Sequence, residues 1–395
     1  MKYLTLIKAI RLRIAKWFPV LLGIIPLTVS FHQASGQVKS PEILEDGSVI
    51  FRLHAPEIDS VTVRGTFGPS ETTIASIEMV KNDTGLFEAK YGPLASDMYV
   101  YTYIVDGIPM LDPNNKVIVR DGSYIESRLV IPGEGFDLYD VKSVPHGQLH
   151  TMWYPSPTIG TDRRMIVYTP PGYETSGESY PVLYLLHGGG GDEEAWISRG
   201  RANYILDNLI AAGKARPMIV VMTNGIPSFP AAPGDRPLAM VMEQTGTGGI
   251  SNMMSGKFEE SLVKDVVPFI EDNFRTIPDA DHRGISGLSM GGYHTLQTTF
   301  RYPDDFEYVG VMSMGLFRNA NKDELVEQIN ALKDSDPTIY YIACGKYDFL
   351  YPGLKELLAL YDELDFEYMY RETEGGHSWN NWRLYLSEIA MLFFK

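Results

Sequence analysis

The chain has very little cysteine and no long apolar run. Of its 395 residues one is cysteine, Cys344, which excludes a disulfide within the chain and with it a disulfide-stapled scaffold. A lipoprotein is also excluded, because no cysteine lies near the amino terminus to carry a lipid. The amino-terminal apolar stretch at 17–29 has 13 residues and includes two prolines. A membrane-spanning helix needs about 20 apolar residues, so this stretch is too short to be one.

Sequence patterns for metal and phosphate binding are missing as well. The chain has no His-Glu-x-x-His pattern, and its carboxylates do not cluster with its histidines along the sequence. It also has no Gly-x-x-x-x-Gly-Lys loop of the kind that cradles phosphates. We therefore expect neither a metal nor another cofactor.

Basic residues are fewer than acidic ones. The chain has 34 Lys and Arg against 50 Asp and Glu, and five of the basic residues fall within the first 16 positions. Without those five, 29 basic residues face 50 acidic ones, a net charge of −21. Such a surface repels nucleic acid and anionic membranes, so we expect neither as a partner.

The amino terminus has the order of a secretory signal peptide. The five basic residues precede the apolar run at 17–29, and the small residues at 34–36 follow it. We expect a signal peptide over residues 1–36, cleavage near Gln37, and a secreted product, periplasmic or extracellular, with no stable membrane insertion afterwards. The alternative, a membrane anchor, is disfavoured because the run is short and contains two prolines.

Length and pattern divide the rest of the chain in two. Single hydrophobic cores stop growing near roughly 250 to 300 residues, so a chain of 395 residues is expected to form two units. We predict a small antiparallel, immunoglobulin-like β-sandwich over residues 37–135. A segment rich in Pro, Gly and Ser at 136–160 is predicted to be a linker. Residues 161–395 are predicted to form an α/β unit.

Short runs of alternating apolar residues predict the strands of the first unit. They are separated by turn sequences, and the clearest runs are Val49–Leu53, Val61–Phe67 and Tyr99–Val105. These segments, with Asp112-Pro113-Asn114, resemble the isoamylase-type N-terminal domain, also called carbohydrate-binding module family 48, over most of residues 42–131. The resemblance implies a glycan-binding module, although Phe87 stands where many members carry Trp, and a spacer or lid remains an alternative. Because the unit lacks an acid, base and nucleophile set, we expect it to aid action on polymers without supplying chemistry.

The second unit alternates apolar strands with helical segments, which predicts a mostly parallel sheet covered on both faces, as in the α/β-hydrolase fold. Apolar residues at helical spacing predict a helix at 258–274. The predicted strands are Met165–Tyr168, Val182–Leu186, Ile219–Met222, Gly284–Ser286, Val309–Ser313, Ile339–Ala343 and Phe366–Tyr370.

A Gly-x-Ser-x-Gly pentapeptide stands at 287–291 and makes Ser289 the candidate nucleophile. In this motif a sharp strand-to-helix turn exposes the serine hydroxyl, and the glycines leave room for the turn. The pentapeptide alone is weak evidence, but here it follows a short strand at 283–286 and precedes a helix-forming stretch at 292–300. We predict acyl transfer through Ser289.

A serine hydroxyl needs a base, and in these folds the order along the chain is serine, acid, histidine. His377 lies in a glycine-rich loop close to the carboxyl terminus and is the candidate general base. His294 also follows Ser289, but it falls one turn into the next helix and is expected to pack or face solvent.

The candidate acid is Asp348, which should orient the histidine. It follows the apolar strand 339–343 through Gly345-Lys346-Tyr347, a position at the same edge of the sheet. A helix cap is the alternative role for Asp348, and Glu374 is the alternative acid. Other carboxylates between Ser289 and His377 are assigned to solvated helix faces and include Asp323, Glu324, Glu356 and Asp362.

His187 is followed by four glycines, directly after the predicted strand 182–186. An acyl-transfer site needs backbone N–H groups aimed at the developing oxyanion, and glycines allow the backbone to approach a substrate closely. We predict that the amides of Gly189 and Met290 form this oxyanion hole.

The same motifs resemble carbohydrate esterase family 1, which is related to esterase D and contains feruloyl and acetylxylan esterases. The resemblance covers about residues 148–395, including Tyr168–Tyr173, Leu185–Gly191 and Gly287–Gly292, together with Ala343–Asp348 and Gly375–Trp379. It implies a serine carboxylesterase of this fold. Pairing with a family 48-type module resembles esterases that trim decorated plant xylans, which implies an acylated plant polysaccharide or oligosaccharide as substrate.

Aromatic residues near the motifs favour a phenolic acyl group. We predict substrate binding by Trp196, which follows the oxyanion glycines, by Phe349 beside the acid, and by Trp379 and Trp382 after the histidine. A ferulate ring gains from stacking, whereas an acetyl group has nothing to stack. Packing of the terminal helix is the alternative role, for Trp382 in particular. The segment 225–257, rich in Met, Pro and Gly, is predicted to be an active-site flap.

Three other functions stay open. The same fold serves acetylxylan esterases, and a siderophore esterase also joins a sandwich to a similar hydrolase. The third is not an enzyme: it is a secreted glycan-binding protein whose hydrolase domain is inactive. The intact set of serine, acid, histidine and glycine residues disfavours it. The oligomeric state cannot be predicted from the sequence.

Overall fold

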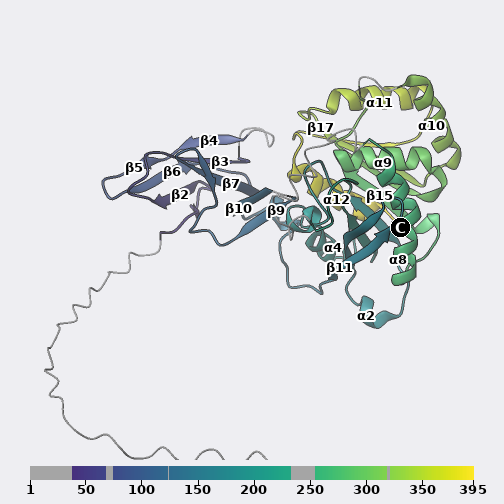
Figure 1. The fold of residues 1–395 in the computed structure, drawn as a ribbon, viewed down its shortest axis with the longest axis horizontal. Coiled ribbons are helices and arrows are strands. Elements are labelled where there is room, and N and C mark those ends of the chain that lie inside the picture. Colours follow the sequence, from purple (N-terminus) through teal and green to yellow (C-terminus); the bar gives the residue numbers. More distant parts are fainter. Residues whose placement is uncertain (1–37, 68–73, 123, 233–253, 318–320) are drawn as a thin grey trace, which may run out of the picture. The chain divides into compact units, whose positions relative to one another are not determined.

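The computed structural model describes residues 38–67, 74–122, 124–232, 254–317 and 321–395 (Figure 1). The predicted signal peptide and most of the predicted flap lie outside the described residues. Within them, no helix is long and apolar enough to cross a membrane.

The amino-terminal part is built from two antiparallel sheets, as predicted. One has the strand order β1-β2-β6-β5, and the other has the order β4-β3-β7-β10-β9, with β8 paired to β7. The strands are β1 Glu42–Ile43, β2 Val49–His54, β3 Val61–Gly65, β4 Ala75–Glu78, β5 Val80–Lys81, β6 Leu86–Tyr91, β7 Asp97–Val105, β8 Ile108–Met110, β9 Ile118–Asp121 and β10 Tyr124–Ile131.

Alternation along these strands directs one face of each sheet inward. In β2 the inward residues Val49, Phe51 and Leu53 are buried, whereas the residues between them are partly exposed. Phe51 packs against Tyr101 of β7, with ring centroids 5.0 Å apart. Asp112 is buried in the same core, where its carboxylate accepts hydrogen bonds from the hydroxyl of Tyr101 at 2.7 Å and from other hydroxyls. The segment around Asp112 is therefore tied to the core by its side chain.

The rest of the chain forms a sheet of eight described strands in the order β11-β12-β14-β13-β15-β16-β17-β18. From β14 to β18 neighbouring strands run parallel, whereas β12 is antiparallel to both β11 and β14. The predicted α/β-hydrolase fold is confirmed, and the last strand lies three residues later than predicted. The strands are β11 Gln148–Ser156, β12 Thr161–Thr169, β13 Val182–Leu186, β14 Ile219–Thr223, β15 Arg283–Leu288, β16 Tyr308–Met312, β17 Ile339–Gly345 and β18 Met369–Thr373.

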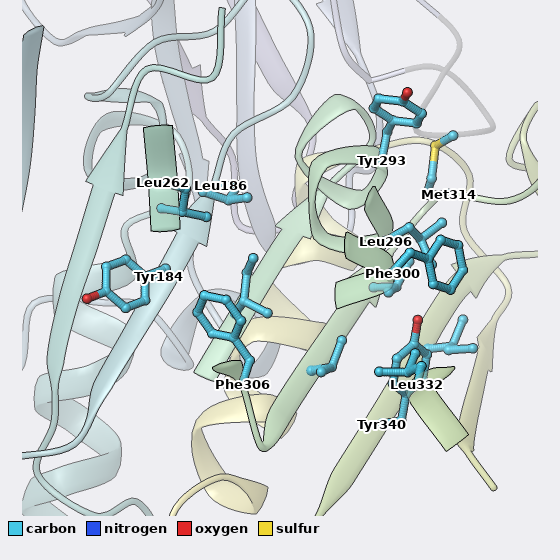
Figure 2. Packing of buried hydrophobic residues seen from close by; sticks show 14 of the residues in the cluster. Tyr184, Leu186, Leu262, Tyr293, Leu296, Phe300, Phe306, Met314, Leu332 and Tyr340 are labelled. Atoms are coloured by element: carbon cyan, nitrogen blue, oxygen red, sulfur yellow. The ribbon is translucent and has the colours of Figure 1, made fainter. Parts of the chain in front are cut away.

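Helices cover both faces of this sheet, which is why a central strand such as β13 is apolar throughout. In β13, Tyr184 and Leu186 point into one core together with Leu296 and Phe300 of α9 (Figure 2). Their neighbours Leu183 and Leu185 point into a second core beneath α4 and α12. The α-helices are α1 Glu134–Asp137, α2 Tyr173–Ser176, α3 Ala195–Ser198, α4 Ala202–Ala211, α7 Lys257–Ser261, α8 Val267–Asn273, α9 Met290–Arg301, α10 Lys322–Ser335, α11 Tyr351–Glu363 and α12 Trp379–Leu392.

The helix predicted at 258–274 is α7 and α8 joined by a π-helical turn, Leu262–Val266. Pro268 lies in the first turn of α8. Proline has no backbone N–H to donate to the preceding turn, and a π-type turn before it changes the hydrogen-bond pairing locally. Apolar periodicity therefore located the helix but not this interruption.

The predicted linker at 136–160 is wrong in part. Its second half is β11, which pairs with β12 over all nine of its residues, from Gln148 opposite Thr169 to Ser156 opposite Thr161. β11 is an edge strand, so one of its hydrogen-bonding edges is unpaired, and Pro155, which has no N–H to donate, can be accommodated in it. An exposed edge strand with proline and serine has the composition of a linker, which explains the error.

The sandwich and the α/β part belong to one compact unit, residues 38–395. Arg383 of α12 donates a hydrogen bond to the carboxylate of Asp97 at the start of β7, at 2.9 Å. The guanidinium group is almost fully buried, and it also donates to the Arg199 carbonyl at 3.0 Å. The amino-terminal part is thus joined to the α/β part by buried charged groups.

Candidate active site

Ser289 lies at the turn between β15 and α9 in a backbone conformation that most residues avoid. Its φ of 53° and ψ of −114° are held by a hydrogen bond from its N–H to the Met312 carbonyl at 2.9 Å. The flanking glycines allow this turn, because a Cβ on Gly287 would lie 2.3 Å from the Gly291 carbonyl oxygen. A Cβ on Gly291 would lie 2.5 Å from the Leu186 carbonyl oxygen. The serine hydroxyl is thereby presented at the carboxyl edge of the sheet.

His377 reaches Ser289 from the loop between β18 and α12. Its Nε2 lies 3.0 Å from the serine Oγ, a hydrogen-bond distance that suits proton transfer from the hydroxyl. Asn381 of α12 holds the loop, because its side-chain amide donates to the Gly376 carbonyl at 2.9 Å and its side-chain oxygen accepts from Thr373 at 3.0 Å. Asn381 belongs to no recognisable sequence motif, so its role in holding the loop could not be predicted from the sequence.

Asp348 completes the contact on the far side of the imidazole. Its carboxylate lies 2.8 Å from Nδ1 of His377, and it accepts a second hydrogen bond from the Leu350 N–H at 2.9 Å. Burial alone would raise the pKa of Asp348, but the hydrogen bond from His377 and the Leu350 amide hold that pKa below its ordinary value. The carboxylate is therefore ionised and accepts a hydrogen bond from the Nδ1–H of His377, which leaves Nε2 free to act as a base.

Glu374, the alternative acid, lies elsewhere. Its side chain is 77% exposed and pairs with Lys346. It makes no described contact with His377, whereas the side chain of Asp348 is fully buried against the imidazole. The geometry therefore favours Asp348 over Glu374.

The side chain of His187 holds the glycine loop after β13 through two hydrogen bonds. Nδ1 of the buried imidazole lies 2.8 Å from the Gly188 carbonyl, and Nε2 accepts a hydrogen bond from the Gly225 N–H at 2.9 Å. Both contacts are satisfied by one neutral tautomer, with the proton on Nδ1. Burial lowers the pKa of His187 to about 4, so the ring stays neutral at neutral pH.

This loop and the end of β15 meet beside the serine. Gly188 and Gly189 line the same cavity as Ser289, and Met290 is the first residue of α9. The amino end of a helix carries unpaired N–H groups and a partial positive charge, which suits an oxyanion. The structure therefore brings both predicted oxyanion residues to the serine.

A cavity of about 450 Å³ opens beside Ser289 and His377. Its size is within the range of small-molecule sites. One wall comes from the α/β part and includes Phe349, Trp379 and Trp382, and the other wall comes from the sandwich. The sandwich residues are Thr66, Ile74, Met98, Val100 and Asp121.

Three of the four predicted substrate-binding aromatics line this cavity. Phe349 is 70% exposed, and its ring centroid lies 4.5 Å from that of His377. The Trp382 ring packs edge-on against the same imidazole at 4.9 Å, and its indole N–H donates to the Ser313 hydroxyl at 2.9 Å. Trp379 lies next to Trp382, with ring centroids 5.3 Å apart. The imidazole therefore contacts two aromatic rings, those of Phe349 and Trp382.

The fourth, Trp196, does not line the cavity. It is 1% exposed, its indole N–H donates to the Leu186 carbonyl at 3.0 Å, and its ring supports Trp379 from behind at 5.2 Å. The prediction of direct substrate contact by Trp196 was wrong. It follows the glycine loop in sequence, but its position in α3 turns the ring into the core.

Other histidines belong to structural contacts. His294 is buried in α9, with Nδ1 2.9 Å from the carboxylate of Glu259, so of the two roles expected for it, packing or facing solvent, it packs. His146 and His150 have the spacing of a His-x-x-x-His pair, but one contacts Asp207 and the other contacts Thr169. Among the described residues, no group of three or more His, Cys, Asp or Glu side chains is placed to hold a metal ion.

Comparisons with known proteins identify similar esterases. Residues 156–393 match the family described as "Putative esterase". The chain is 31% identical over 362 residues to an endo-1,4-beta-xylanase/feruloyl esterase of Xylanibacter ruminicola, covering 90% of this chain and 46% of that protein. The chain thus spans about half the length of this curated relative.

Solved structures share the fold. A ferulic acid esterase structure aligns with 62% of this chain and 97% of its own, at 25% identity and a TM-score of 0.51. The enterobactin esterase of Shigella flexneri aligns with 87% of this chain and 92% of its own, at 17% identity and a TM-score of 0.63. The family match spans more than half of the chain and includes all three residues of the Ser289, His377 and Asp348 contact. The chain therefore belongs to this esterase family.

Proposed function

We propose that this protein is a secreted serine carboxylesterase that releases ferulate or a related hydroxycinnamate from acylated plant hemicellulose such as arabinoxylan. The observation that carries the proposal is the continuous hydrogen-bonded contact from Asp348 through His377 to Ser289, at the mouth of an aromatic-lined cavity. The feruloyl and ferulic acid esterase names of the relatives support the choice of acyl group.

In the proposed acylation step, Nε2 of His377 accepts the Ser289 proton while Oγ attacks the ester carbonyl carbon. The carbonyl π electrons move to oxygen, and the resulting oxyanion accepts hydrogen bonds from the amides of Gly189 and Met290. As the C–O bond breaks, His377 gives its proton to the departing sugar oxygen. Asp348 keeps the imidazole oriented and stabilises its charged form.

Deacylation repeats the same steps with water. His377 takes a proton from the water, the hydroxide attacks the acyl carbon, and the proton then passes to Oγ of Ser289 as the carboxylic acid leaves. The products are a free sugar hydroxyl and the hydroxycinnamic acid. These steps need no cofactor.

The acyl group is tested by comparing kcat/KM for methyl ferulate, 4-nitrophenyl acetate and acetylated xylan, together with ferulate release from arabinoxylan. We expect the highest kcat/KM for the ferulate ester, because its ring can stack against the aromatic wall. A clear preference for acetylated substrates with negligible ferulate release would replace this proposal with an acetylxylan esterase and leave the serine mechanism intact.

A siderophore esterase is the second candidate. The observation in its favour is the fold match to the enterobactin esterase, which extends over 87% of this chain and so includes the sandwich. Including enterobactin among the substrates separates the two candidates. Turnover of enterobactin with negligible hydrolysis of methyl ferulate would favour the siderophore function.

Secretion and glycan binding are parts of the same proposal. We expect the exported protein to begin near Gln37, which amino-terminal sequencing of the mature protein from culture fractions can check. We also expect the sandwich to aid action on polymer, as the resemblance to a carbohydrate-binding module implies. Binding of the Ser289→Ala variant to insoluble arabinoxylan in a pull-down measures this directly, and equal binding to an unrelated insoluble polymer would contradict it.

A further inference from the structure

The end of strand β9, residues Arg120–Gly122 in the sandwich, touches both loops that form the proposed site. One loop carries the oxyanion glycines after β13, and the other carries His377 and Trp379. We name this segment the β9 tip. It shows no catalytic motif. Besides its pairing with β10, it contacts residues of the α/β part.

The first contact joins two glycine backbones. A Cβ on Gly122 would lie 1.9 Å from the Gly190 carbonyl oxygen and 3.2 Å from the Gly191 Cα, so no side chain fits between them. Gly122 also has a φ of 60°, which favours glycine. The β9 tip therefore presses directly on the oxyanion loop, one residue beyond Gly189.

The second contact is an ion-pair network on the same loop. Arg120 Nη1 lies 2.6 Å from the carboxylate of Asp192, and its Nη2 lies 2.7 Å from that of Glu194. The Asp192 side chain is fully buried, and Nη1 of Arg120 also donates to the Gly122 carbonyl at 2.6 Å. One guanidinium group thus ties the β9 tip to the segment that follows the glycines.

The third contact reaches the histidine loop. Asp121 accepts a hydrogen bond from the Trp379 indole N–H at 3.2 Å, and it lies 3.8 Å from Arg199. Trp379 follows His377 by two residues, and its ring packs against Trp382, which contacts the imidazole. Asp121 itself lines the cavity with Ser289.

We infer that Arg120 is a positioning residue for the oxyanion hole, which it holds through Asp192 and Glu194. A run of four glycines has many backbone conformations, and an oxyanion donor works only when it is held at the place where the charge develops. The two ion pairs of Arg120 and the backbone contact of Gly122 restrict the conformation of the glycine loop, and both residues belong to the sandwich. This inference rests on the serine mechanism proposed above, but it does not depend on the identity of the acyl group.

The experiment compares Arg120→Ala with Arg52→Ala, using the full chain and 4-nitrophenyl acetate. Arg52 is a matched control in the sandwich: its side chain is 19% exposed against 18% for Arg120, and it pairs with Glu42 and Glu88 at 2.7 Å each. Rates are divided by the number of active sites titrated to completion with a fluorophosphonate, so that a loss of folded protein does not count as a loss of kcat. Circular dichroism melting confirms that both variants are folded at the assay temperature.

Arg120→Ala is expected to lower kcat per titrated site by at least tenfold with KM changed less than twofold, because oxyanion hydrogen bonds act in the transition state. The loss should stay below the 10²- to 10³-fold that follows removal of an oxyanion donor. Arg52→Ala is expected to keep kcat within twofold. If Arg120→Ala does not fold, Arg120→Gln, which keeps most of the side-chain stem, is expected to show the same loss.

Wild-type kcat in the folded Arg120 variant, or an equal loss in Arg52→Ala, would overturn the inference. The first result would mean that the loop holds its geometry without Arg120, and the second that any weakening of the sandwich has the same effect. Failure of the serine mechanism is seen separately, as retained activity in Ser289→Ala.

Discussion

The two walls of the cavity differ in how they arise from the sequence. The α/β wall carries Ser289 and His377. These two residues and Asp348 each follow a parallel strand of the eight-stranded sheet, and each lies in a short glycine-containing motif. On the sandwich wall, Val100 and Asp121 come from ordinary strands that carry no motif, and they meet the site only through tertiary contacts. The comparison teaches that the chemistry lies in local motifs, whereas the shape and support of the site come from contacts that are distant in sequence.

The largest expected effect is on the α/β wall. Ser289→Ala, His377→Ala and Asp348→Asn should each lower kcat/KM for methyl ferulate by about 10³-fold or more, because the three groups act as a unit. Steady-state kinetics with purified variants measures this. Near wild-type turnover in any one of them would remove that residue from the mechanism.

The second prediction concerns stability between pH 4 and 7. Burial lowers the pKa of His187 to about 4 in the folded protein, while an unfolded histidine has its ordinary pKa of about 6.5. The unfolded state therefore binds more protons in this window. The stabilisation is complete above about pH 6.5 and is lost progressively as the pH falls towards 4.

Urea unfolding of wild type and His187→Asn, measured at several pH values, checks this. We expect the free energy of unfolding of the wild type to fall more steeply between pH 6.5 and 4.5 than that of the variant. Parallel curves would show that His187 does not titrate as its buried contacts imply.

A smaller effect is expected at the aromatic wall. Phe349→Ala should lower kcat/KM for methyl ferulate relative to 4-nitrophenyl acetate by about 2- to 10-fold, which corresponds to a stacking contribution of about 0.5 to 1.5 kcal/mol. The acetate ester serves as the internal control, since the Phe349 ring also touches His377. An unchanged ratio would mean that Phe349 does not contact the acyl group.

The smallest effect is expected at the alternative acid. Glu374→Gln removes an exposed ion pair with Lys346, and exposed pairs contribute little. Activity should therefore stay within twofold of wild type. A loss comparable with that of Asp348→Asn would show that Glu374 supports His377 after all.

Much of the α/β part could be predicted from sequence because its signals are local. The apolar strands and the motifs around Ser289 and His377 depend on residues close together in the chain, and the structure has them as expected. The interpretation of Trp196 failed because a side chain's direction depends on the helix that carries it. Asn381 and Ser313 were missed because they support the loops through hydrogen bonds that leave no pattern in the sequence.

The sandwich was predicted as a fold but not as part of the site. Its alternating strands indicate which residues are buried, and the two antiparallel sheets are confirmed. Nothing in the residues of β9 indicates that Arg120 will meet Asp192, because the two residues are 72 positions apart in the sequence. The error at 136–160 has a related cause, since an edge strand is defined by its neighbour rather than by its own composition.

The central claim is that Ser289 carries the acyl group during turnover. Rapid mixing of the enzyme with excess methyl ferulate, acid quenching and peptide mass spectrometry measures this directly. We predict one feruloyl group on the peptide that contains Ser289, and none in Ser289→Ala. Hydrolysis at the wild-type rate with no adduct on that peptide, or an adduct on another residue, would contradict the account.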